Sequence, residues 1–97
     1  MSIRLAERAK EMAEKIIELL KLEYEFKQYE DKGKYIEIYI PLSDLLRVGI
    51  DTSAVYLPLL WLHAKYEIES WPFKYWGKVH GYIFRVPKSI TEGWAKR

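Results

Sequence analysis

Apolar residues recur at every third or fourth position near the start of the chain. The resulting stripe comprises Leu5, Ala9, Met12, Ile16, Leu19 and Leu20. Charged residues fill most of the positions between them, and this pattern is typical of an amphipathic helix. Ser2 can accept a hydrogen bond at its start. We predict a long first helix over residues 3–22, with its apolar stripe facing the core or a partner helix.

The hydrophobic period then changes to two. Aromatic and β-branched residues alternate with charged residues over 23–30 and 34–40, and Gly33 between them can adopt the positive φ of a short loop. Pro41 lacks an N–H and ends the second strand. We therefore predict a β-hairpin over residues 23–41. One face of its second strand, which carries Ile36, Ile38 and Ile40, would belong to the core. The other face, which carries Tyr35, Glu37 and Tyr39, would be exposed to solvent or covered.

Two helices are predicted next. The first is short and spans residues 43–47, because Gly49 can end it with a positive φ. The second would span residues 52–64. Pro58 falls in its second turn, so we expect a kink or a shortened start. A buried strand over residues 54–62 is the alternative, because a short apolar run fits both structures.

Strand-like alternation returns in the last third of the chain. Residues 66–70 and 79–86 are predicted as two strands of a hairpin that occupies residues 65–87. The intervening residues 71–78 are too many for a tight turn, so an unusually aromatic loop is expected there. Residues 88–97 would form a short tail with a helical turn.

The segment 42–55 resembles the core of helix-turn-helix proteins. A turn glycine is followed by an aliphatic residue, a polar helix start and a second aliphatic residue. The matching positions are Gly49, Ile50, Thr52, Ser53 and Val55. The resemblance extends over about residues 42–87 and implies a winged helix-turn-helix domain. The expected α+β fold then has a long N-terminal helix, a β-hairpin, a helix-turn-helix-like pair at 42–64 and a C-terminal hairpin as the wing.

Length and composition narrow the class of protein. A chain of 97 residues is the size of one domain with one core. The absence of cysteine excludes disulfides, thiolate metal sites and cysteine nucleophiles. We expect a cytoplasmic protein, because no apolar stretch is long enough for a membrane span or a signal peptide. The lack of Asn and the single Gln suggest a thermophilic source, although chance also explains them in a short chain.

Charge is distributed unevenly along the chain. Residues 1–70 contain 10 Lys and Arg against 13 Asp and Glu, whereas residues 71–97 contain 6 Lys and Arg against Glu92 alone. A basic end that is also rich in aromatic residues suits a partner with phosphates and bases. A solvated basic tail is the simpler reading of the same charges.

The favoured hypothesis is nucleic-acid binding, to DNA rather than RNA, through the phosphate backbone and with a role in transcription regulation. The predicted contacts are Lys74, Lys78, Arg85 and Lys88 with phosphates, and Tyr75 and Trp76 with bases; Thr52, Ser53 and Tyr56 are secondary candidates. Base reading by the second helix is not expected, because its outward residues include no Arg or Lys.

The alternative hypothesis is a module for protein interaction or homodimerisation, because aromatic residues also pack in cores and interfaces. A dimer is also compatible with nucleic-acid binding. Neither His63 nor His80 belongs to a catalytic or metal-binding motif, so we predict no enzyme activity, cofactor, metal or small-molecule substrate.

Overall fold

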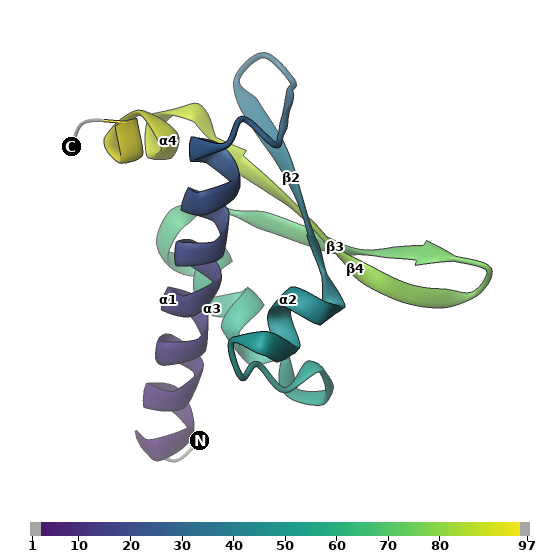
Figure 1. The fold of residues 1–97 in the computed structure, drawn as a ribbon. Coiled ribbons are helices and arrows are strands. Elements are labelled where there is room, and N and C mark those ends of the chain that lie inside the picture. Colours follow the sequence, from purple (N-terminus) through teal and green to yellow (C-terminus); the bar gives the residue numbers. More distant parts are fainter. Residues whose placement is uncertain (1–2, 96–97) are drawn as a thin grey trace.

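The computed structural model has an α+β fold in which a long N-terminal helix and three shorter ones accompany a four-stranded antiparallel sheet (Figure 1). It describes residues 3–95, with side chains from residue 6 onward. The predicted cap Ser2, the side chain of Leu5, and the basic residues Lys96 and Arg97 lie outside this range. The elements are α1 (Ile3–Glu25), β1 (Glu30–Asp31), β2 (Tyr35–Pro41), α2 (Leu42–Arg47), a 3₁₀ turn (Thr52–Ala54), α3 (Tyr56–Tyr66), β3 (Glu69–Tyr75), β4 (Lys78–Pro87) and α4 (Lys88–Ala95).

The core lies between the helices and one face of the sheet. In the described part of the apolar stripe of α1, Ala9, Met12, Ile16 and Leu20 are buried, as the periodicity predicts, and Leu19 is half-buried. Helices α1, α2 and α3 contribute to the same cluster as β2 and β4. Among residues 3–95, no helix combines the length and the apolar character needed to cross a bilayer.

The strand order is β1-β2-β4-β3. Strand β2 therefore pairs with the distant β4 along its whole length, from Tyr35 opposite Pro87 to Pro41 opposite Gly81. The predicted alternation in β2 is correct, since Ile36, Ile38 and Ile40 are buried. The sheet thus combines two local pairings, β1 with β2 and β3 with β4, with one pairing between strands far apart in the sequence.

The predicted hairpin over residues 23–41 is wrong in its first half. Residues 23–25 continue α1, and β1 has only two residues. Helix α1 ends in a Schellman motif, in which Lys27 adopts a φ of 58° and the N–H of Gln28 donates to the carbonyl oxygen of Glu23 over 2.8 Å. Tyr24 stacks on Tyr29 and meets Trp94 of α4 edge to face, so an aromatic cluster favours the extra helical turn.

The helix pair forms as predicted, and the strand alternative for residues 54–62 is wrong. Gly49, with φ 81°, ends α2; the N–H of Ile50 donates to the carbonyl oxygen of Leu45. Ile50 and Val55 are buried. Pro58 shortens the start of α3 and lies in its first turn, where helical N–H groups have no intrahelical acceptor.

The predicted aromatic loop over residues 71–78 is also wrong. Strand β3 continues to Tyr75, and only two residues form the turn. The predicted start of this strand at residue 66 is wrong too, because Tyr66 is the last residue of helix α3. Pro72 is tolerated because β3 is an edge strand. The predicted tail contains a full helix, α4, in which Thr91 is buried and donates to the carbonyl oxygen of Lys88.

Candidate nucleic-acid interface

The tip of the C-terminal hairpin is a tight turn with unusual residues. We call residues 74–78 the hairpin tip. Tyr75 pairs with Lys78, and the two residues between them, Trp76 and Gly77, have φ values of 54° and 73°. Positive φ at both central positions is the mark of a type I′ turn, whose twist matches that of the flanking strands. A side chain at the first position strains the backbone by about 1–2 kcal/mol, which Gly or Asn would largely avoid.

Trp76 is the most exposed large apolar side chain described, with 86% of its surface open to solvent. Its ring meets that of Tyr75 edge to face, with centroids 6.0 Å apart. Neither burial nor a favourable backbone conformation accounts for tryptophan at this position. Such a combination of strain and exposure points to a role outside folding.

A β-bulge lies just behind the tip. Lys74 is opposite Val79 but Phe73 is opposite Gly81, so His80 is the extra residue of β4. The ring Nε2 of His80 lies 3.2 Å from the carbonyl oxygen of Tyr75, and the hydroxyl of Tyr39 donates to the carbonyl oxygen of His80 over 3.1 Å. These bonds fix the direction in which the tip projects from the sheet, and Figure 1 shows the hairpin extending well beyond the helices.

Both lysines of the hairpin tip are exposed, and neither forms an ion pair within residues 3–95. The chain from residue 70 to residue 91 contains no carboxylate side chain. Strand alternation places Lys78 and Tyr75 on one side of the hairpin and Lys74 on the other. A ligand at the tip therefore meets two positive charges that flank exposed aromatic rings.

The remaining predicted cations have partners at the base of the hairpin. The guanidinium of Arg85 donates a hydrogen bond to the carboxylate of Glu37 over 3.2 Å. It also lies over the ring of Trp71, 5.2 Å from the ring centroid. The Nζ of Lys88 lies 2.8 Å from an oxygen of Asp31. The hydrogen bond from Lys88, together with one from the backbone of Gly33, holds the pKa of the Asp31 carboxyl below its usual value. Arg85 and Lys88 are therefore less available to phosphates than the tip lysines.

The predicted residues before α3 form a separate site. Asp51 accepts hydrogen bonds from the hydroxyl and the backbone N–H of Ser53, and these bonds lower the pKa of its carboxyl. Thr52 is half-buried, whereas the ring of Tyr56 is exposed. A carboxylate held in its charged form beside this helix start disfavours a phosphate there. At the opposite end of α3, Lys65 lies over the rings of Trp61 and Tyr66.

The sequence also contains exposed aromatic residues that were not predicted as a site. Tyr35, Tyr39 and Phe73 lie on the face of the sheet that is turned away from the core, and Tyr39 meets Phe73 edge to face. The alternation in β2 identifies Tyr35 and Tyr39 as outward residues. It does not reveal that Phe73 of β3 lies beside Tyr39, because the pairing of β2 with β4 is non-local.

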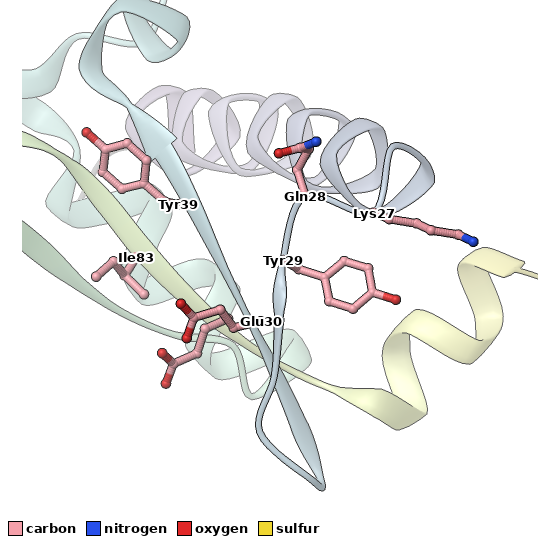
Figure 2. Close-up of a pocket in the computed structure, with 7 residues that line it drawn as sticks. Lys27, Gln28, Tyr29, Glu30, Tyr39 and Ile83 are labelled. Carbon is pink, nitrogen blue, oxygen red and sulfur yellow. The ribbon is translucent and has the colours of Figure 1, made fainter.

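A hollow beside this face has a volume of about 470 Å³ (Figure 2). It is lined by Lys27, Gln28, Tyr29, Glu30, Glu37, Tyr39 and Ile83. Figure 2 shows Tyr39 and Tyr29 pointing in different directions across it. Its carboxylates already have cationic partners, Lys32 for Glu30 and Arg85 for Glu37. Within the described part of the chain, no three His, Asp or Glu side chains gather as a metal site would require.

Comparison with known proteins found no matching family model, curated protein or solved structure.

Proposed function

We propose that this protein binds nucleic acid, DNA in preference to RNA, through the hairpin tip. Lys74 and Lys78 neutralise phosphates, and Trp76, supported by Tyr75, stacks on a base or a sugar. The observation that carries the proposal is the exposed indole of Trp76, held in a strained turn between two lysines that form no ion pair with any described residue. Aromatic rings flanked by cations are what a nucleic-acid backbone and its unstacked bases require.

The arrangement of the elements supports the same function. A long helix, a strand, two short helices and a hairpin follow one another, and β4 lies between β2 and β3. Over residues 42–87, two short helices followed by a hairpin agree with the order that the resemblance to winged helix-turn-helix domains implies. We include a role in transcription regulation and a cytoplasmic location in the proposal.

Backbone contacts rather than base reading are proposed because of the surface of α3. The exposed positions Tyr56 and Leu60 are uncharged, and Lys65 is engaged with aromatic rings. Bidentate donors to base edges are therefore missing from the exposed part of this helix, whose sequence contains no Arg, Asn or Gln. Affinity should depend little on duplex sequence.

The experiment is a salt titration of binding to a generic labelled duplex and to a single strand. Two neutralised phosphates give a slope of log K against log salt of about −1.8 for duplex and about −1.4 for single strand. The double variant Lys74→Glu/Lys78→Glu should abolish binding at low salt. The matched control Lys10→Glu/Lys34→Glu makes the same change in net charge at exposed lysines outside the hairpin and should retain the slope. Equal losses in both double variants would show that only net charge matters and would refute the proposed site.

A further inference from the structure

The hairpin tip presents one flat ring at its very end. Trp76 and Gly77 lie between the paired residues Tyr75 and Lys78, so the indole belongs to the apex of the ribbon, beyond the last cross-strand pair. The indole is 86% exposed, and the ring of Tyr75 meets it edge to face and does not stack on it. A flat face of the indole is therefore open to a partner at the tip.

The tip is braced from behind and projects away from the helices. The hydroxyl of Tyr39 donates to the carbonyl oxygen of His80, and the ring Nε2 of His80 lies 3.2 Å from the carbonyl oxygen of Tyr75. Figure 1 shows the end of the hairpin well clear of the helices. A partner can therefore pass along either face of the ribbon near the tip, and a tip that is already ordered loses little conformational entropy on binding.

Only a base with an uncovered face can stack on such a ring. In the interior of a duplex, each base pair is covered by its neighbours, and the grooves present base edges instead of faces. Insertion of a ring between two base pairs must first unstack them, which costs a free energy of the same order as one ring recovers by stacking. Where a duplex ends or its strands separate, one face of the last base pair is already open. The indole therefore favours that position.

The two lysines of the hairpin tip distinguish a fork from a blunt end. Lys78 lies on one face of the ribbon and Lys74 on the other, and neither forms an ion pair within residues 3–95. When the ring at the apex covers the last base pair, two unpaired strands that diverge from that pair run along the two faces, and each meets one lysine. A blunt end has no phosphates beyond its last pair, and a single strand has one backbone for two faces.

We infer that the hairpin tip recognises the fork at which a DNA duplex opens into two single strands. Trp76 stacks on the last base pair, Lys74 neutralises a phosphate of one strand, and Lys78 neutralises a phosphate of the other. This inference rests on the proposed function and names the class of DNA that the tip binds. It agrees with the absence of Arg, Asn and Gln from α3, because a fork is recognised by its shape and requires no base edges to be read.

The first experiment compares four DNAs of one sequence at low salt, by competition in fluorescence anisotropy with the full chain. They are a forked duplex with two unpaired arms, a blunt duplex, a single strand and a covalently closed circular duplex, which has no ends. The fork should bind the wild type about 5- to 150-fold more tightly per site than the circle, the factor that stacking of one base on a ring contributes. Trp76→Asn should remove this preference, whereas the matched control Phe26→Asn, which removes another exposed ring, should keep it. Circular dichroism verifies that both variants fold.

A fluorescent base locates the ring directly. 2-Aminopurine in the last base pair of the fork should change its fluorescence when the wild type binds, because the indole stacks on it. The same base placed well inside the duplex should not respond. With saturating Trp76→Asn, the signal at the last pair should also stay constant.

Deletion of one arm at a time tests the positions of the lysines. For the wild type, removal of either arm should reduce the magnitude of the slope of log K against log salt by about 0.7, the contribution of one single-strand phosphate. In Lys74→Ala one arm should become dispensable, and in Lys78→Ala the other. The control Lys34→Ala, at an exposed lysine outside the hairpin, should remain sensitive to both arms.

Three results would overturn the inference and leave the proposed function standing. The first is salt-dependent binding with equal affinity per site for the fork and the circle. The second is a single strand that competes as well as the fork, and the third is a pair of lysine variants that make the same arm dispensable. The absence of binding to all four DNAs would refute the proposed function as well.

Discussion

Replacing Trp76 with Asn should separate binding from folding. The substitution removes the exposed indole and installs the residue that a type I′ turn favours before glycine. Relief of backbone strain stabilises the variant by about 1 kcal/mol. Loss of the edge-to-face contact with Tyr75 destabilises it by about 0.5–1.5 kcal/mol. The two effects nearly cancel, so the free energy of unfolding should change by less than about 1 kcal/mol.

Nucleic-acid affinity should respond very differently to the same change. Stacking of one base on an aromatic ring contributes about 1–3 kcal/mol, so the dissociation constant should rise about 5- to 150-fold. Urea denaturation gives the stability, and fluorescence anisotropy of a labelled oligonucleotide at low salt gives the affinity. Phe26→Asn, which removes a similarly exposed ring at the end of α1, is the control and should bind like the wild type.

Two results would refute this reasoning about Trp76. A loss of more than about 2 kcal/mol of stability would mean that the indole holds the hairpin together and is not reserved for a partner. Unchanged affinity in a folded Trp76→Asn variant would mean that the ring does not contact nucleic acid.

Two other predictions concern stability. Gly81→Ala should destabilise the fold by about 1–3 kcal/mol in urea denaturation, because a Cβ there would lie 2.5 Å from the carbonyl oxygen of Ile40 and 2.7 Å from the ring of Tyr39. The control Gly93→Ala in α4, where a Cβ would have nothing within 4 Å, should be neutral or stabilising, and equal effects of the two substitutions would contradict the packing described. The pKa values of Asp31 and Asp51 lie below 3.8 in the folded state, so the stability that these two carboxylates contribute is present above pH 3.8 and is lost as the pH falls through their folded pKa values. The double variant Asp31→Asn/Asp51→Asn should therefore lose less thermal stability than the wild type between about pH 5 and about pH 2.5. Parallel losses in the two proteins would contradict that expectation.

Local patterns in the sequence predict much of the fold correctly. The stripe of α1, the alternation in β2 and the turn at Gly49 each depend on neighbouring residues, and each appears as predicted. The errors arise where distant residues decide the structure. Residues 23–25 join α1 because Tyr24 packs against Trp94, and Tyr66 is helical although its neighbours alternate like a strand.

The candidate site was predictable in composition but not in arrangement. Sequence alone identifies a basic aromatic segment that contains Lys74, Trp76 and Lys78. It gives no sign that Trp-Gly forms a two-residue turn, because Asn-Gly is the usual signal for one. Nor does it show that Arg85 and Lys88 face acidic residues more than 40 positions earlier in the chain. These facts follow from strand pairing, which local propensity does not determine.

The most direct test of the hairpin tip as the binding site is an NMR titration of ¹⁵N-labelled protein with a short oligonucleotide at low salt. The chain has four tryptophans, and the indole signal of Trp76 is identified by its absence from the Trp76→Asn spectrum. We predict that this signal and the amides of residues 74–78 shift or broaden first, while the indole of Trp61 stays unchanged. Saturable shifts confined to α3 and the 3₁₀ turn, with the Trp76 signal unmoved, would contradict the account.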